Sequence, residues 1–197
     1  MINILTEPPA TALINGTDYP IKSDYRIWVN ISMLLEDLDF ISGTKESDKY
    51  NIMIISEIIY LAFGELLNEP YIDTFMAVLE FMQGYPEMKD KGFSGHGNNK
   101  KLYSFRCDLN YIILAIRNQT GIDLTYRRKE PFHWWDFLLE FKTLEDNHYI
   151  CKIMSYRAYE GKDKELLKLK QTYALPKNLT KSEQAIINEL DELFYNS

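Results

Sequence analysis

The sequence predicts a mainly α-helical fold, with a compact multi-helix domain, a short N-terminal β-hairpin and an amphipathic C-terminal helix. Several long segments place apolar residues three or four positions apart, the spacing that puts side chains on one helix face. A strand-like pattern flanks Asn15-Gly16, a pair that supports the positive φ angles of a tight hairpin turn. With 197 residues, of which 46% are hydrophobic, the chain is long and apolar enough to bury one ordinary core.

The first predicted elements are the hairpin, over residues 11–22, and a helix that continues to about Phe40. Ser23 or Asp24 begins this helix, because either side chain can accept hydrogen bonds from the free amides of a first turn. Gly43 ends it. The apolar face of the helix is predicted to contain Ile27, Ile31, Leu34, Leu35 and Leu38.

Two further helices are predicted, over residues 47–68 and from Pro70 to Gly84. Proline suits the first turn of a helix, because its missing amide would have no partner there. Residues 85–101, which are rich in glycine and asparagine, are predicted to form a surface loop. The apolar face of the 47–68 helix is predicted to contain Ile55, Ile58, Ile59, Ala62 and Leu66.

The second half of the chain is predicted to form helices over residues 103–119, from Pro131 onward and over 145–160. Gly121 ends the first of them in a left-handed conformation that costs glycine little. We expect the aromatic side chains after Pro131 to fill a core rather than to bind a partner directly. The buried positions are predicted to be Leu109, Ile112, Ile113 and Ile116 in the first helix, and Phe132, Trp134, Trp135, Phe137, Leu138 and Phe141 in the second.

A Lys-rich segment over residues 162–170 and then Pro176 separate a last predicted helix from the rest of the chain. We therefore divide the chain into a helical domain over 1–175 and a C-terminal amphipathic arm over 176–197. A short isolated helix is marginal in water, so the apolar stripe of the arm needs the chain's own core or another protein. The candidate partner-binding residues of the arm are Ile186, Ile187, Leu190, Leu193 and Phe194.

Charge and composition exclude several broad classes. The formal net charge of −7 disfavours nucleic acids and membrane surfaces, because both are polyanions. Residues 1–9 lack the basic start and apolar run of a signal peptide, and charged residues interrupt the most apolar stretch, 52–67. Cys107 and Cys151 have no paired spacing, which favours a reducing compartment. We expect a cytoplasmic protein without a nucleic-acid or membrane partner.

Two segments have part of a ligand-binding pattern. The loop Gly92–Lys101 is glycine-rich, but it lacks the Gly-Lys-Ser/Thr ending of a phosphate-binding loop. The basic run Arg127–Lys129 lies near Trp134 and Trp135, a combination that can bind nucleic acid by charge and stacking. In an acidic chain without a wider basic surface, we expect this run to be a solvated turn before a buried aromatic helix.

Four residues have the chemical types of a zinc site or a thiol nucleophile. His148 and Cys151 are three positions apart and could meet His133 and Cys107 in the fold, but structural zinc sites usually show two close ligand pairs. Cys107 beside Asp108 offers a thiol next to a carboxylate, but residue types without geometry carry little weight. We predict no catalytic residue, no cofactor and no metal.

Several short motifs follow one another along the chain after the Asn-Gly hairpin. They are Ile21-Lys22-Ser23-Asp24-Tyr25-Arg26, Tyr103-Ser104-Phe105 with Asp108 and Tyr111-Ile112, Gly121-Ile122-Asp123-Leu124, Phe132-His133-Trp134-Trp135-Asp136-Phe137, Ile153 to Arg157, and Gly161-Lys162-Asp163-Lys164. This order resembles the bacteriophage gene-product-fifteen family of phages and prophages of low-GC Gram-positive hosts, over residues 11 to about 170. The chain departs from that pattern at Asn118-Gln119-Thr120, at the loop from Gly92 and in the tail from Pro176.

The resemblance implies a non-catalytic tail assembly chaperone, since members are typically encoded between the tail tube and tape-measure genes. Such chaperones bind the tape-measure protein in the host cytoplasm, help to recruit tube subunits and then leave. Self-association of the chain stays open. The alternatives are a structural tail or connector component of the virion and a phage inhibitor of a host protein. The motif residues expected to be structural are Asp24, Arg26, Asp108, Asp123, His133, Trp134, Trp135, Phe137 and Arg157.

Overall fold

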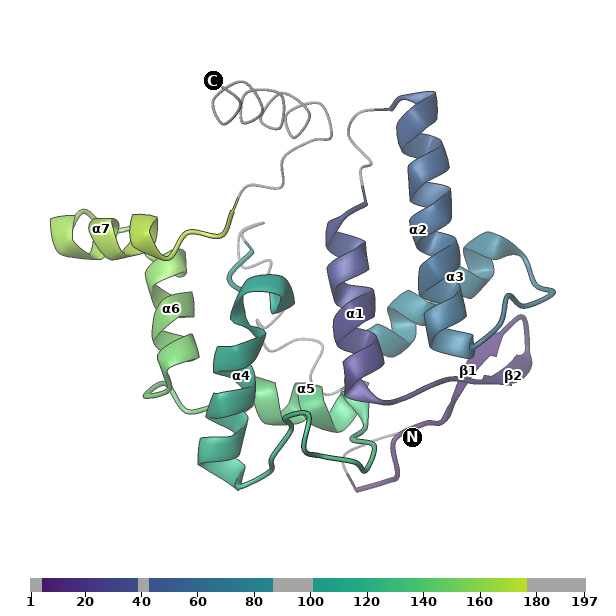
Figure 1. Ribbon diagram of the computed structural model, residues 1–197, viewed down its shortest axis with the longest axis horizontal. Coiled ribbons are helices and arrows are strands. Elements are labelled where there is room, and N and C mark those ends of the chain that lie inside the picture. The colour runs from purple at the N-terminus through teal and green to yellow at the C-terminus, as the bar shows by residue number, and fades with distance from the viewer. Residues whose placement is uncertain (1–4, 39–42, 87–100, 177–197) are drawn as a thin grey trace, which may run out of the picture.

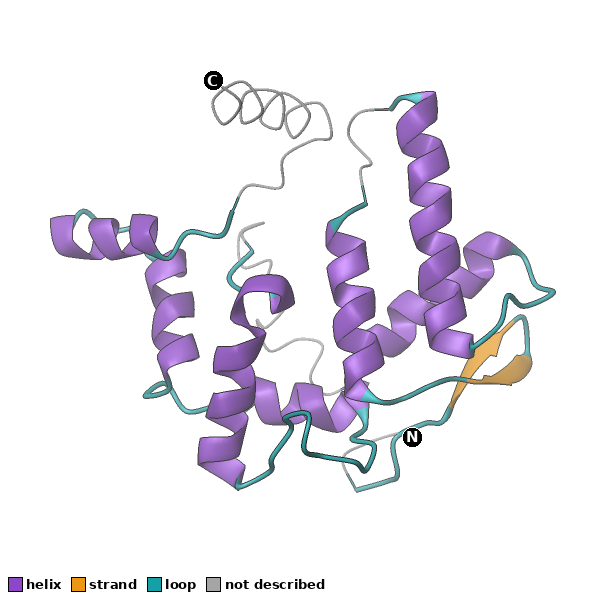
Figure 2. Ribbon diagram, viewed as in Figure 1, coloured by secondary structure: helices purple, strands orange, loops and turns teal. Residues whose placement is uncertain are grey.

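The computed structural model describes residues 5–38, 43–86 and 101–176, and the predicted fold class is confirmed there. Helices dominate these ranges, and the one sheet within them is a two-stranded antiparallel hairpin (Figure 2). The elements are β1 (Thr11–Ile14), β2 (Thr17–Pro20), α1 (Tyr25–Glu36), α2 (Lys45–Phe63), α3 (Tyr71–Met82), α4 (Phe105–Thr120), α5 (Trp134–Lys142), α6 (Tyr149–Ala158) and α7 (Lys164–Thr172).

Helix α1 joins the two halves of the fold (Figure 1). It contacts α2 on one side, and α2 packs on α3, which in turn packs on β1. On the other side α1 contacts α4 and α5, α4 packs on α6, and α6 on α7, which projects at the edge of the molecule (Figure 1). None of the helices in the described ranges has the combination of length and apolar character needed to cross a bilayer.

The N-terminal hairpin has the register that the Asn-Gly turn predicts. Ile14 pairs with Thr17, and the two residues between them have positive φ, 50° at Asn15 and 84° at Gly16. Because successive strand residues face opposite sides, Ile14 is buried whereas Leu13 is 65% exposed. The hairpin therefore covers part of the core with one face and leaves the other face open.

Helix α1 begins where predicted and ends earlier. The Asp24 side chain accepts a hydrogen bond from the Arg26 amide, and the helix ends at Glu36 instead of continuing to about Phe40, which lies outside the described residues. The buried face is also broader than the predicted stripe: Trp28 and Val29 are buried beside Ile31. The other predicted positions, Ile27, Leu34, Leu35 and Leu38, are partly buried against the core.

Helix α2 starts and stops two to five residues before the predicted bounds. Thr44 and Ser47 form a capping box at its start, and Gly64 ends it with a φ of 87°. Ile58, Ile59 and Ala62 are buried as predicted, and Ile55 is half-buried. Assigning Leu66 to the apolar face of this helix was wrong, because Leu66 follows the left-handed stop and is 62% exposed.

The remaining predicted helices are present with shifted starts. Pro70 is the N-cap of α3 rather than a first-turn residue, and α4 ends at Gly121, whose φ is 78°. Helix α5 begins at Trp134 instead of near Pro131, and α6 begins at Tyr149 instead of Glu145. Helix α7 was not predicted; it is capped by the Asp163 side chain and has no buried residue. The predicted C-terminal helix and residues 87–100 of the predicted loop lie outside the described residues.

The core is built around stacked aromatic rings from α1, α3, α4 and α5. Trp28 stacks on Phe81 with a centroid separation of 4.7 Å and on Trp134 at 6.1 Å. Trp134 also stacks on Phe137 at 5.5 Å and meets Phe105 edge-on at 6.0 Å. Such ring pairs add to the free energy of area burial, so this aromatic cluster anchors four helices to one another.

All three tryptophans of the chain, Trp28, Trp134 and Trp135, are buried. We expect blue-shifted tryptophan emission that acrylamide quenches weakly, and red-shifted, easily quenched emission in urea. Steady-state fluorescence with and without urea measures both. Native emission as accessible to quencher as the unfolded chain would contradict the core packing of these rings.

Candidate functional site

The motif residues Asp24 and His133 join the starts of α1 and α5. They form an antiparallel bridge in which the Tyr25 amide donates to the Phe132 carbonyl at 2.8 Å and the Trp134 amide donates to the Ser23 carbonyl at 2.7 Å. Residues more than 100 positions apart in sequence thus share a short stretch of main-chain pairing. We call this pairing of residues 23–25 with residues 132–134 the clamp, because it joins the two halves of the chain.

The Asp24 carboxylate accepts several hydrogen bonds in this clamp. Its carboxylate accepts from the Arg26 guanidinium at 2.7 Å and 2.8 Å, and from the amides of Arg26 and Phe132. Burial opposes ionisation of Asp24, but these hydrogen bonds and the Arg26 charge outweigh it and lower the pKa of the carboxyl. Arg26 also donates to the Arg128 carbonyl at 3.3 Å, which ties the basic turn to the clamp.

His133 has a defined tautomer in the clamp. Its Nδ1 accepts from the Trp135 amide at 3.0 Å and thereby caps α5, so Nε2 carries the hydrogen and donates to the Pro9 carbonyl at 3.1 Å. Burial lowers the pKa of His133, against the opposing effects of the Pro9 hydrogen bond and the Asp136 charge. Protonation of Nδ1 would remove the acceptor that caps the helix.

Lowering the pH from 7.5 to 5 is therefore expected to destabilise the protein. The pKa of His133 is lowered in the folded state, so the unfolded chain takes up the proton first, at about pH 6.5. The contribution of neutral His133 to the free energy of unfolding is complete above that pH, and it is lost as the pH falls through the pKa of the folded state. Urea midpoints measured across this range should show the decline. His133→Asn keeps a capping acceptor and should flatten it; an unchanged slope in that variant would exclude His133 as the cause.

Asp108 and Arg157 form a buried ion pair that connects α4 with α6. The guanidinium donates to the two carboxylate oxygens at 2.6 Å and 3.0 Å, and both side chains are more than 90% buried. Arg157 also donates to the carbonyls of Leu102 and Tyr173, and Asp108 accepts from the Ser104 amide. The Asp108 carboxylate and two carbonyls thus share one guanidinium, and a buried charge requires such hydrogen bonding.

The remaining motif residues also contact the chain's own groups. Asp123 accepts from the Thr125 amide at 3.0 Å, and this hydrogen bond lowers the pKa of its carboxyl. The Trp135 indole donates to the Phe81 carbonyl at 2.7 Å, and Phe137 stacks on Tyr25 at 5.0 Å. Trp135 and Phe137 thus join helices, whereas the Asp123 bond is local to its turn. Residue spacing alone does not predict these contacts.

The structure does not bring the two cysteines and two histidines together as a thiol or metal centre. His133 binds Pro9, whereas His148 pairs with Gln119 through Nε2 at 3.1 Å. Cys107 is exposed, and burial raises the pKa of the half-buried Cys151 thiol. Within the described ranges, no group of three or more His, Cys, Asp or Glu residues is placed to hold a metal ion.

The basic turn beside the aromatic helix is also occupied by local contacts. The Arg128 guanidinium lies over the Phe132 ring at 5.2 Å, and Arg127 lies over Tyr126 at 5.8 Å. Trp134 and Trp135 are buried, so they present no stacking surface for a base beside this turn. The basic run and the tryptophans are therefore not one binding surface.

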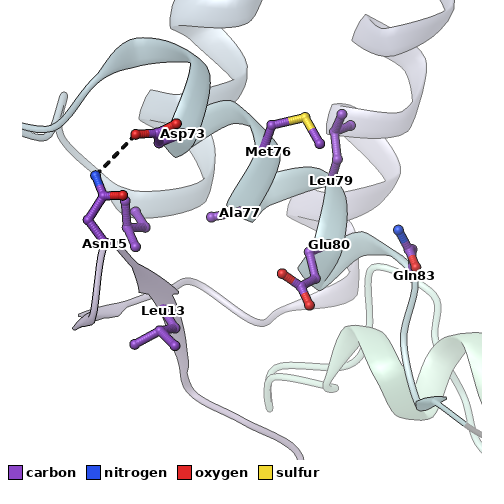
Figure 3. A pocket seen from close by; sticks show the side chains of 9 residues that line it. Leu13, Asn15, Asp73, Met76, Ala77, Leu79, Glu80 and Gln83 are labelled. Atoms are coloured by element: carbon purple, nitrogen blue, oxygen red, sulfur yellow. Dashed lines mark hydrogen bonds between the residues drawn. The ribbon is translucent and has the colours of Figure 1, made fainter.

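A groove of about 410 Å³ lies between the hairpin and α3. Figure 3 shows Leu13 and Asn15 on the hairpin side, Asp73, Met76 and Glu80 along α3, and Gln83 just after the end of the helix. We call it the hairpin–α3 groove; its lining is completed by Ile14, Ala77 and Leu79. Sequence reasoning missed it. One feature of the sequence could have indicated it: α3 has apolar residues on more than one face. Ile72 and Met76 are exposed, whereas the buried positions of the helix are Thr74, Ala77, Val78 and Phe81.

The hairpin–α3 groove has a fixed wall. The Asn15 amide nitrogen donates to Glu69 at 3.0 Å and to Asp73 at 3.1 Å, the second bond being drawn in Figure 3. Tyr19 donates to Glu69 at 2.5 Å, which lowers the pKa of that carboxyl and raises the pKa of the phenol. The turn of the hairpin is thereby held on the start of α3, so the groove is formed before any partner binds.

These features define a helical protein that uses its motif residues to join helices and presents a partly apolar groove on its surface. The family model described as Bacteriophage Gp15 protein matches residues 6–179, most of the chain. The chain belongs to this bacteriophage family, as its motif order predicted, and is thus of the phage structural or assembly class. Neither a curated protein nor a solved structure matches it.

Proposed function

We propose that the protein is a tail assembly chaperone, which binds the tape-measure protein in the host cytoplasm, assists tail tube assembly and catalyses no reaction. The family match over residues 6–179 carries this proposal, together with the gene position that the resemblance implies. A chaperone needs surface that can cover a client and later release it. Exposed apolar side chains provide such surface, because removing them from water favours association.

The distribution of exposed apolar side chains supports a role in protein binding. More than half of the large exposed hydrophobic residues in the described ranges belong to β1, α2, α3 and the α2–α3 connection. They are Leu13, Ile52, Met53, Tyr60, Leu66, Ile72 and Met76. Methionine is frequent at surfaces that accept several partners, because its side chain is unbranched and polarisable.

The C-terminal arm is the second proposed contact with a client or with another copy of the chain. Its candidate residues Ile186, Ile187, Leu190, Leu193 and Phe194 lie outside the described residues, so this assignment rests on their helical spacing alone. Deleting residues 176–197 should leave the thermal midpoint nearly unchanged and weaken client binding or oligomerisation. Unchanged binding and unchanged oligomeric state would contradict the role of the arm.

Affinity isolation from phage-producing cells tests the proposed function. We expect the tagged full chain to co-purify the tape-measure or tail tube protein, and the variant lacking residues 176–197 to recover less of it. Equal expression of the two forms is the control. Recovery of a host protein without either tail protein would overturn the proposal and favour an inhibitor.

A further inference from the structure

We infer that the hairpin–α3 groove binds a cationic amphipathic helix of a partner protein. The inference concerns the chemistry of the partner and goes beyond the proposed function, since it holds whether that helix belongs to a tape-measure, tube or other protein. It rests on three observations: the charge of the groove, the order of its side chains along α3 and the fixed position of the hairpin.

The lining of the groove is acidic. Asp73 and Glu80 line it, and no basic residue does. Residues 50–86 contain no Lys, Arg or His at all, and their acidic residues are Glu57, Glu65, Glu69, Asp73 and Glu80. An uncompensated acidic surface favours a basic partner and repels an acidic one.

The acidic groups of the groove are not neutralised by neighbours in the described ranges. The four ion pairs found there involve the carboxylates of Asp24, Glu36, Asp37 and Asp108, none of which lines the groove. The donors to Glu69 and Asp73 are Asn15 and Tyr19, which are neutral. Hydrogen bonds from neutral groups orient these carboxylates and leave their negative charge available to a partner.

The order of side chains along α3 matches a helical ligand. Asp73, Met76 and Glu80 follow at intervals of three and four residues, so they share one face, with the apolar residue between the two carboxylates. The carboxylates are separated by seven residues, roughly 10 Å along the helix axis at 1.5 Å per residue. A partner helix with Lys or Arg at positions i and i+7 and Leu or Met between them repeats this spacing.

The walls of the groove can hold the apolar side of such a helix. Leu13 on the hairpin and Met76 on α3, 65% and 57% exposed, flank a floor that includes the buried residues Ile14 and Ala77. The Asn15 bonds to Glu69 and Asp73 hold the hairpin wall against α3, so little ordering is needed when a helix docks. Helix-in-groove recognition combines an apolar face and flanking charges in this way.

A designed amphipathic helical peptide with Lys at i and i+7 around a Leu stripe is the probe, and a peptide with Glu at those two positions is its control. Fluorescence anisotropy with the full chain should show binding of the Lys peptide that weakens as salt is raised, and much weaker binding of the Glu peptide. Hydrogen exchange should show protection in residues 11–16 and 71–83. Equal affinity for the two peptides, or protection confined to other segments, would overturn the inference.

Matched variants locate the site. Asp73→Asn with Glu80→Gln should weaken binding of the Lys peptide about fivefold or more, as expected for two exposed charge pairs. Glu57→Gln with Glu65→Gln removes the same charge from the same half of the protein and should change the affinity less than twofold. Leu13→Ala with Met76→Ala should also weaken binding, and Leu114→Ala with Leu167→Ala, which removes exposed leucines from α4 and α7, should not. Circular dichroism checks that each variant is folded; equal losses in groove and control variants would refute a defined site.

Discussion

Asp108→Ala is expected to lower the free energy of unfolding by about 3–5 kcal/mol, the usual cost of breaking a buried ion pair by removing one partner. The Arg157 guanidinium would remain buried with its charge uncompensated, and the Ser104 amide would lose its acceptor. Because Arg157 also binds the Leu102 and Tyr173 carbonyls, the loss should loosen the packing of α4, α6 and α7 together.

Urea unfolding of Asp108→Ala, Arg157→Met and the double variant tests the role of this pair. The double variant should be less destabilised than the sum of the single variants, because neither charge is left alone. Asp37→Ala is the matched control: it breaks an exposed pair with Arg106 and should cost at most about 1 kcal/mol. A cost for Asp108→Ala as small as that of the control would show that the buried pair does not hold the helices together.

Trp134→Ala is expected to cost about 3–5 kcal/mol, the range for removing a large aromatic side chain from a core. The ring is 1% exposed, stacks between Trp28 and Phe137, and donates its indole hydrogen to the Met82 carbonyl at 3.0 Å. The substitution leaves a cavity where α1, α4 and α5 meet and a carbonyl without its donor. Both effects act in the same direction.

Thermal and urea unfolding of Trp134→Ala measures this effect. Tyr126→Ala is the control, because that aromatic side chain is 82% exposed and its removal should change the stability by no more than about 0.5 kcal/mol. If the two variants were equally stable, the aromatic cluster would not be the anchor of the fold.

Local signals in the sequence predicted much of the fold. The Asn15-Gly16 turn, the Asp24 cap and the Gly121 stop depend on neighbouring residues only, and all three are present. The predicted helix ends were wrong where apolar residues at helical spacing continue past a helix-ending glycine, as Leu66 does after Gly64. Helix α7 was not predicted because the Lys-rich composition of residues 162–170 indicated a linker, although Leu166, Leu169 and Tyr173 follow at helical spacing and are half-buried.

The contacts of the motif residues could not be predicted from the sequence. Asp108 and Arg157 are 49 positions apart, and only the packing of α4 on α6 brings them together. The hairpin–α3 groove has the same character, since Leu13 and Met76 become its walls only after Asn15 fixes the hairpin on α3. Periodicity identifies which face of a helix is apolar, but it does not say what will lie beside it.

The two proposed binding regions give the chain two separate ways to hold a partner. The hairpin–α3 groove is lined by residues within the range 13–83, whereas the arm covers residues 176–197. Two linked contacts raise the overall affinity through effective concentration, and either can be released while the other holds. Loss of both should therefore weaken client capture more than the loss of either alone.

Quantitative mass spectrometry of purified virions, compared with assembly complexes from the same cells, tests the chaperone function most directly. We predict that the chain is abundant in complexes that contain the tape-measure or tube protein and is absent from finished particles. Retention of the chain in virions at a fixed number of copies per particle would contradict the chaperone function and identify the protein as a structural component.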